Sequence, residues 1–240
     1  LISMIMTAVA TFIAGRYLFR DGFASAGWRW GKVHHYLLVI LLALVIWLLP
    51  SLIELLTGMH APPEGVTVLG ILQLFITTFA ITLVPAFSEE FSWRGYLLPR
   101  LVEKHGEWRG LLIHGLITWV WHVPFIVITA SWMPGDAAIN IALVLAISFI
   151  PAILHAVIFA YIWASSTSLI VVTVYHAAFD EVRDSIQNTV GFGPLVEGWQ
   201  ILLVIILGLF LLLRAIELCC SIKLTRLQQH RTVMLEPGSF

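Results

Sequence analysis

Two adjacent glutamates, Glu89 and Glu90, interrupt a long apolar stretch of this chain. A carboxylate at membrane depth costs about 2.5–3.5 kcal/mol on insertion scales, so it persists where it faces a protein interior or a wet cavity and has partners. Arg94 follows Glu90 by four residues, one helical turn along the same face, and is its predicted partner. Glu89 has no cation at a spacing of three or four. We therefore expect Glu89 to be the carboxylate that is available as a general base.

Two further polar clusters lie in apolar surroundings. His122 is preceded by two tryptophans in four residues, and His176 is followed four residues later by Asp180, on the same helical face. At about 1.5 Å per residue, His122 lies about 18 Å from the basic entry of its helix and His176 about 14 Å from the start of its own. Glu89 lies about 16 Å before Arg100 by the same rule. The three groups are therefore predicted to reach a similar depth.

A carboxylate and two histidines at one depth suit hydrolysis by an activated water. Glu89 would take the proton of the water, His122 would orient the water, and His176 would donate to the developing oxyanion. The same groups could instead hold a divalent metal such as zinc, with Glu89, His122, His176 and Asp180 as candidate ligands. These residues leave both chemistries open, and no other cofactor is indicated. A purely structural alternative is a buried ion pair between Glu90 and Arg94 and a helix-to-helix hydrogen bond from His122.

The composition places these residues in a membrane protein. The chain is 60% hydrophobic and 11% charged, with a mean hydropathy of +0.95, whereas soluble domains carry about 25% charged residues. The net charge of -1, with no concentrated basic face, excludes a nucleic-acid partner. The lipid bilayer is therefore the predicted surrounding.

Hydropathy predicts an all-α polytopic bundle of about seven membrane helices, since a span needs about 20 apolar residues. The chain begins inside an apolar run, so a further helix before Leu1 would raise the number to eight. Turn residues such as those around Pro63 and Pro134 separate the spans. The predicted spans are 1–19, 34–57, 66–90, 110–130, 137–164, 167–184 and 198–220.

The segment 91–104 differs from the spans because it mixes aromatic and leucine residues with Arg94, Arg100, Glu103 and Lys104. This pattern predicts an interfacial amphipathic helix that continues from the acidic pair. Gly95 or Pro99 is expected to break it.

Connections that carry Lys and Arg alternate along the chain with connections that carry none, and this alternation predicts the orientation of the protein in the membrane. They flank the first, third and last connections, while the connections around Pro62 and Pro134 have none. The basic side should face the cytoplasm, with the site opening to it, in a multi-pass protein of a prokaryotic inner (cell) membrane. We expect one integral membrane domain, 1–220, with a catalytic core at about 83–184 and a short cytoplasmic tail, 221–240.

The polar clusters also carry a family resemblance. The chain resembles the CPBP family, the CAAX proteases and bacteriocin-processing membrane proteins that include the type II CAAX prenyl endopeptidases. The family motif Glu-Glu-x-x-x-Arg matches from Glu89 to Arg94, a second motif matches at His122, and a third, His-x-x-x-Asn or a close variant, matches from His176 to Asp180. The three motifs occur in order between about residues 83 and 180.

Two positions depart from the family pattern. The second motif usually has an aromatic residue four positions before the histidine, where this chain has Thr118. The third motif ends in Asp180 rather than the more usual Asn. An ionised Asp accepts hydrogen bonds but donates none, so Asp180 is expected to orient His176 or to approach a metal.

The resemblance implies a role for each matching residue. By this carry-over Glu89 is the catalytic base, Glu90 and Arg94 form its supporting pair, and His122 positions the water. His176 with Asp180 would stabilise the transition state or ligate a metal.

The resemblance implies an intramembrane endopeptidase that acts on a membrane-associated peptide or protein. The substrate would be a prenylated CAAX-type C-terminus or a bacteriocin or leader-type peptide. A non-catalytic immunity or scaffold protein, binding a partner through the same polar cluster, is the alternative. A proton-coupled transporter is a further rival, against which the missing inverted repeat counts.

Overall fold

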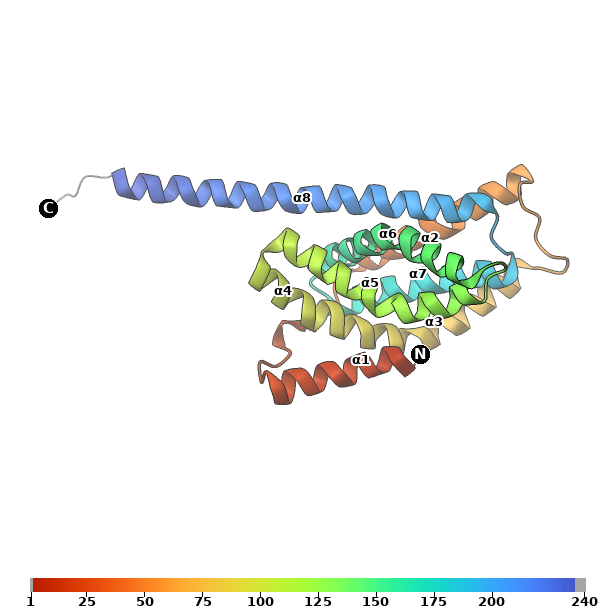
Figure 1. The fold of residues 1–240 in the computed structure, drawn as a ribbon, viewed down its shortest axis with the longest axis horizontal. Helices are drawn as coiled ribbons and strands as arrows, with labels where there is room; N and C mark the ends of the chain where they lie inside the picture. Colours follow the sequence, from red (N-terminus) through yellow and green to blue (C-terminus); the bar gives the residue numbers. More distant parts are fainter. Residues whose placement is uncertain (1, 236–240) are drawn as a thin grey trace.

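The computed structural model describes residues 2–235, with the backbone alone at position 197 and at 217–235. The described chain is helical without strands, which confirms the predicted all-α class (Figure 1). The predicted tail, 221–240, falls where no side chain is described and stays a prediction. In chain order the elements are α1 (Ile2–Ile13), η1 (Ala14–Leu18), η2 (Ala24–Ala26), α2 (Val33–Thr57), α3 (Val68–Glu90), η3 (Phe91–Leu97), α4 (Leu98–His105), α5 (Glu107–Ser131), α6 (Ala137–Ser166), α7 (Leu169–Thr189) and α8 (Pro194–Leu235).

Five segments of the described chain are long and apolar enough to cross a membrane, against about seven predicted. They are Val33–Thr57, Val68–His105, Glu107–Ser131, Ala137–Ser166 and Pro194–Ile216. The first predicted span, 1–19, is not among these five segments because its apolar helix, Ile2–Leu18, is short. The sixth differs because the second half of α7 carries four charged residues between Asp180 and Asp184. The predicted polytopic helical bundle is confirmed, and five of its helices in the described chain are long and apolar enough to span a membrane.

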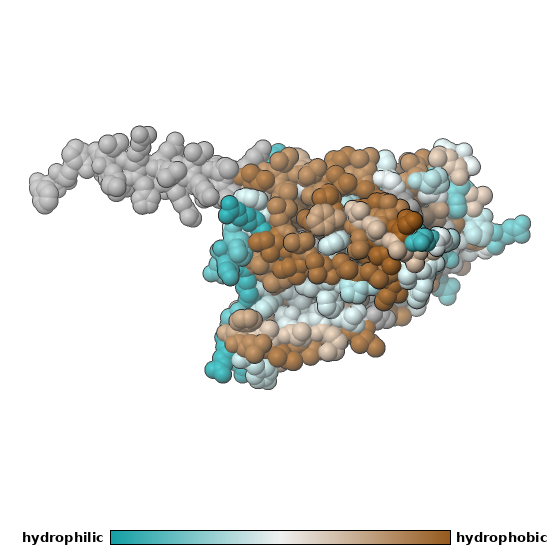
Figure 2. All heavy atoms as spheres, viewed as in Figure 1, coloured by the Kyte–Doolittle hydropathy of each residue, from teal (hydrophilic) through white to brown (hydrophobic). Residues whose placement is uncertain are grey.

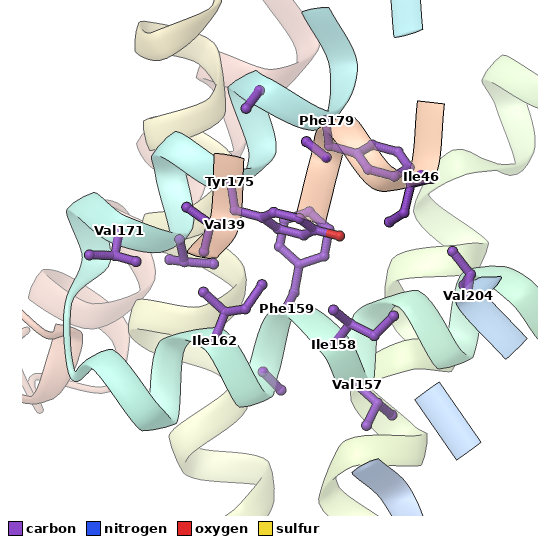
Figure 3. Packing of buried hydrophobic residues seen from close by; sticks show 14 of the residues in the cluster. Val39, Ile46, Val157, Ile158, Phe159, Ile162, Val171, Tyr175, Phe179 and Val204 are labelled. Carbon is purple, nitrogen blue, oxygen red and sulfur yellow. The ribbon is translucent and has the colours of Figure 1, made fainter. Parts of the chain in front are cut away.

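Helix α7 lies inside the bundle, where it packs mainly against α2 and α3. Figure 3 shows Tyr175 and Phe179 of this helix beside Phe159 of α6 and Ile46 of α2. The rings of Tyr175 and Phe159 lie 4.8 Å apart in an edge-to-face contact, and Tyr175 is fully buried. Because neighbouring helices rather than lipid surround α7, its charged residues can be satisfied by protein groups.

The acidic pair ends α3 and is followed directly by a π-helical segment, η3. Together α3, η3 and α4 run as one helix from Val68 to His105. The residues from Phe91 to Tyr96 are buried, so the predicted interfacial helix over 91–104 is wrong for its first half. Only α4, which begins after η3, is short and amphipathic. A π-turn widens the helix by one residue and is frequent at functional sites.

A polar contact ties η3 to the loop that follows η1. Arg100 donates from Nε to Asp21 Oδ2 at 2.6 Å and from a terminal nitrogen to the carbonyl of Tyr96 at 2.7 Å. The Tyr96 hydroxyl donates to the other oxygen of Asp21 at 3.1 Å. The hydrogen bond from Arg100 holds the pKa of the Asp21 carboxyl below its ordinary value of 3.8. This contact holds the end of η1 against the π-segment.

A buried carboxylate joins the other end of the bundle. Glu54, near the end of α2, accepts hydrogen bonds from the backbone N–H groups of Gly193, Leu195 and Val196 at 3.0, 2.5 and 3.3 Å. These groups begin α8, whose first N–H groups have no partners within the helix. Glu54 therefore caps α8 and fixes its start to the end of α2.

The surface of the bundle is apolar along the helices and polar at the two ends (Figure 2). Figure 2 shows a broad brown, apolar band over the helices, with teal residues at the two ends of the bundle. Large apolar side chains such as Leu72, Ile76 and Phe125 are more than half exposed in this band. Such a continuous apolar belt with polar ends is typical of a protein embedded in a bilayer.

Candidate active site

Glu90 is the centre of the polar cluster. Its side chain is fully buried, and its Oε1 accepts from Arg94 at 2.9 Å and from His176 Nδ1 at 2.7 Å. The predicted pairing of Glu90 with Arg94 across one helical turn is thereby confirmed. The other oxygen, Oε2, is buried without a hydrogen-bond partner among the described residues. An unpaired buried carboxylate oxygen is costly, so this end of the cluster has unused acceptor capacity.

Arg94 is 5% exposed and is held on two sides. Its guanidinium carbon lies 4.1 Å from the centre of the Phe159 ring, and one terminal nitrogen donates to Glu90. Phe159 also meets the His176 ring edge to face at 5.5 Å. The aromatic face and the carboxylate together stabilise a positive charge next to the acidic pair.

His176 connects three carboxylates. Its Nδ1 lies 2.7 Å from Glu90 Oε1, and its Nε2 lies 3.4 Å from Asp180 Oδ2 and 4.0 Å from Glu89 Oε2. Because ionised carboxylates only accept, the ring nitrogen that meets Glu90 must carry a proton. Asp180 in turn lies 3.3 Å from Arg183. The structure thus brings Glu89, Glu90, His176 and Asp180 together, and it places Asp180 where it orients His176.

Glu89 is held more loosely than Glu90. It is 3% exposed, and its Oε1 accepts from the indole N–H of Trp121 at 3.3 Å. Its Oε2 makes no hydrogen bond within the described chain and has His176 Nε2 at 4.0 Å. A separation of that size is too long for a direct hydrogen bond and is suited to a bridging water. Sequence reasoning missed Trp121, although an indole N–H in an apolar helix next to His122 needs a partner.

His122 stands apart from the carboxylates. Its side chain is exposed, and its Nδ1 lies 2.7 Å from the carbonyl oxygen of Thr118, to which it donates. Within the part of the chain that the structure describes, His122 forms no hydrogen bond, ion pair or ring contact with Glu89 or His176. Helix α5 reaches the acidic pair through Trp121, whose indole N–H donates to Glu89, and the common depth predicted for His122 stays a prediction. The side chain that arrives there is the neighbour of His122, and the role of His122 stays a prediction.

A metal centre is not identified among the described residues. Across the described residues, no group of three or more His, Cys, Asp or Glu side chains is placed to hold a metal ion. Both ring nitrogens of His176 face carboxylate oxygens, and the Nδ1 of His122 faces a backbone carbonyl. Of the predicted ligands, Glu89, His176 and Asp180 lie together and His122 does not. We therefore derive no reaction step through a metal.

A comparison with known families finds a match over the part of the chain that holds this cluster. Residues 70–182 match the family model described as type II CAAX prenyl endopeptidase Rce1-like. The matched segment runs from the start of α3 to the second half of α7 and includes every predicted site residue from Glu89 to Asp180. A search of curated proteins found no significant match to the chain.

Proposed function

We propose that Glu89 activates a water that hydrolyses a peptide bond within the membrane, on the premise that residues 70–182, which match the family model of Rce1-like type II CAAX prenyl endopeptidases, carry the activity of that family. The family supports an intramembrane endopeptidase in general, and five long apolar helices support an integral membrane protein. The identity of the base, the water and the substrate are our proposal.

The observation that carries this proposal is the unequal environment of two neighbouring carboxylates. Glu90 is engaged by Arg94 and His176 at 2.9 and 2.7 Å, whereas Glu89 accepts one longer hydrogen bond at 3.3 Å. The engaged carboxylate neutralises and positions the cations. The other carboxylate keeps an oxygen, Oε2, that can take a proton. Pairs of acidic groups in different environments are the usual arrangement for general acid–base catalysis.

In the proposed reaction, Glu89 Oε2 takes a proton from water while the water oxygen bonds to the carbonyl carbon of the scissile peptide. The electron pair of the carbonyl double bond moves to its oxygen, which accepts a hydrogen bond from His176 Nε2. Collapse of this tetrahedral species breaks the C–N bond, and Glu89 returns the proton to the leaving amine. Glu90 holds His176 in place through Nδ1 at 2.7 Å.

A groove beside the site offers a route for the substrate. A cavity of about 520 Å³ lies between α1, with the first residue of η1, and the residues Ser92, Trp93, Tyr96, Leu97 and Trp121. In Figure 2 a pale band of less hydrophobic residues separates α1 from the brown face of the bundle. We propose that a membrane-presented peptide, with a prenylated CAAX-type C-terminus or a leader-type sequence, reaches Glu89 along this groove.

The orientation follows from charge. Exposed Arg16, Arg20, Arg29 and Lys32 lie near the end of the bundle where α4 carries Lys104. By the positive-inside rule this end faces the cytoplasm, and we propose that the substrate arrives from that side. A prokaryotic inner membrane is the proposed location.

The test is cleavage of a quenched-fluorescence peptide library, including farnesylated Cys-terminal peptides, by the detergent-purified full chain. Glu89→Gln should lower kcat by about a hundredfold to ten-thousandfold while the fold is kept. Glu103→Gln is the matched control, because Glu103 is an exposed glutamate on α4. Parallel reactions with a strong chelator report whether a metal takes part. Cleavage that survives at the wild-type rate in Glu89→Gln would refute the role of the base. Binding of a membrane partner that is intact in this variant, without cleavage in the wild type, would favour the immunity or scaffold alternative.

A further inference from the structure

Trp121 is the residue through which the proposed base and the groove meet. Its indole N–H donates to Glu89 Oε1 at 3.3 Å, and its ring lines the groove between α1 and η3. The ring is 39% exposed, although the carboxylate that it contacts is 3% exposed. Trp121 therefore covers Glu89 on the side of the groove.

Glu89 depends on this single donor for its orientation. Within the described chain no other group hydrogen-bonds its carboxylate, whereas Glu90 is held by both Arg94 and His176. When a hydrogen bond fixes one oxygen of a carboxylate, it also fixes the direction in which the other oxygen points. With Oε1 on the indole, Oε2 is the atom that faces His176, at 4.0 Å. A base held in this way needs less reorganisation before it accepts a proton.

The indole is itself held in place. Its ring meets Trp93 of η3 at 5.9 Å between ring centres, in an edge-to-face contact. Trp93 is 9% exposed, so the ring against which Trp121 rests is fixed by the core of the molecule. The π-segment that follows the acidic pair thus also supports the side chain that orients Glu89.

We infer that Trp121 is a positioning residue for the reaction, whose indole N–H orients Glu89 so that Oε2 takes the proton. The inference rests on the proposed function, since it assigns a role through Glu89. In a packing role only the shape of the Trp121 ring would affect activity. In the positioning role the N–H group affects activity independently of the ring.

Two substitutions at position 121 separate the N–H group from the ring, and a third substitution, at position 119, is the control. Trp121→Phe keeps an aromatic ring against Trp93 and removes the donor. Incorporation of β-(3-benzothienyl)alanine at position 121 keeps the full bicyclic shape and replaces the N–H by sulfur. Trp119→Phe is the matched control, because the indole of Trp119 lies on the same helix and donates to Ser148 Oγ at the same distance of 3.3 Å, away from Glu89.

The readout is steady-state cleavage by the purified full chain, with kcat and KM measured separately. The Trp121→Phe and benzothienyl variants should lose on the order of tenfold in kcat, because a hydrogen bond to a charged group is lost, with KM nearly unchanged. Trp119→Phe should keep both parameters. In a Glu89→Asp background, where the shorter carboxylate withdraws from the indole, Trp121→Phe should cost little more.

Wild-type kcat in the benzothienyl variant would overturn the inference, and so would an equal loss in the presence and absence of Glu89→Asp. If the Trp121→Phe variant fails to fold, the benzothienyl variant tests the inference, because its side chain keeps the shape of the indole. The proposed function fails in a distinguishable way, because wild type and Glu89→Gln would then cleave equally or not at all.

Discussion

Among the carboxylates that the described chain buries, the one that caps the start of α8 and the two at the end of α3 have different surroundings. Glu54, which is 1% exposed, accepts three backbone N–H groups from the start of α8. Glu89 and Glu90 are as deeply buried, yet Oε2 of Glu90 has no partner and Glu89 accepts one long hydrogen bond within the described chain. The carboxylates of the two regions are buried to the same extent, but those of the acidic pair each have fewer hydrogen bonds to their oxygens than Glu54 receives.

The difference shows how a buried acid becomes structural or reactive. At Glu54 the donors are backbone groups at a helix N-terminus, which are rigid and which favour negative charge. At the acidic pair the donors are side chains of Arg94, His176 and Trp121. Side-chain donors can respond to a bound substrate, and incomplete pairing leaves an oxygen free to accept a proton. We therefore expect substitutions to affect stability in the first region and activity in the second.

The largest expected effect is that of Glu89→Gln. Loss of a general base should lower kcat by about a hundredfold to ten-thousandfold. The thermal midpoint should stay the same or rise, because the substitution removes one of two adjacent buried charges. Cleavage kinetics and thermal unfolding in the same detergent check both parts. A large drop in the midpoint would mean that Glu89 is structural, as Glu54 is.

Glu54→Gln should show the opposite pattern. The amide group would face the N–H groups of Gly193, Leu195 and Val196, so at least one buried donor loses its acceptor. The expected loss is about 1–3 kcal/mol in the free energy of unfolding, with kcat of the folded protein unchanged. Thermal unfolding and activity per folded molecule measure the two parts. Reduced kcat at full folding would break the contrast between the regions.

Gly193→Ala tests whether the contact of Glu54 with the start of α8 contributes to stability. A Cβ at this position would lie 2.5 Å from Oε2 of Glu54, so the carboxylate would have to move away from its donors. We expect a loss of about 1 kcal/mol in stability. Gly198→Ala, five residues later and within α8, is the control, because a Cβ added there would have no atom within 4 Å and alanine favours helix. Equal effects at the two glycines would argue against the Glu54 contact.

The smallest expected effect concerns Asp21, an exposed carboxylate held by Arg100. Its pKa in the folded protein is lowered by that hydrogen bond, so its stabilisation is present above the ordinary value of 3.8 and is lost as the pH falls through the folded pKa. Asp21→Asn should cost a few tenths of a kcal/mol at pH 7, since exposed ion pairs contribute little. The difference in thermal midpoint between wild type and variant should shrink as the pH falls below 3.8 and vanish below the pKa of Asp21 in the folded protein. A difference that grows in acid would contradict this assignment.

Local spacing predicted the contacts that lie within one helix. The i,i+4 pairs Glu90–Arg94 and His176–Asp180 both form, at 2.9 and 3.4 Å. Helical geometry alone brings such residues together, so they need no knowledge of the fold. The interfacial helix failed for its first half because amphipathic composition cannot reveal that η3 turns into the core.

Contacts between distant elements could not be predicted in the same way. Trp121 and His122 are neighbours, and which of them reaches Glu89 depends on the rotation of α5 against η3. Glu54 meets groups about 140 positions later, so nothing near it in the sequence indicates a helix cap. The position of α7 against α2 and α3 was not predicted either, because the residue pattern of one helix does not show which other helices surround it.

The sequence by itself determined that this chain is an all-α membrane protein, that an acidic pair and a histidine interrupt its apolar helices, and that Glu90 has Arg94 as a partner. Hydropathy and helical periodicity are local properties, which is why they can be read without a structure. Only the tertiary structure decided that His176 joins Glu90, that Trp121 rather than His122 contacts Glu89, and which buried carboxylate is fully hydrogen-bonded. Those outcomes depend on helix packing, which sets the distances between groups far apart in the chain.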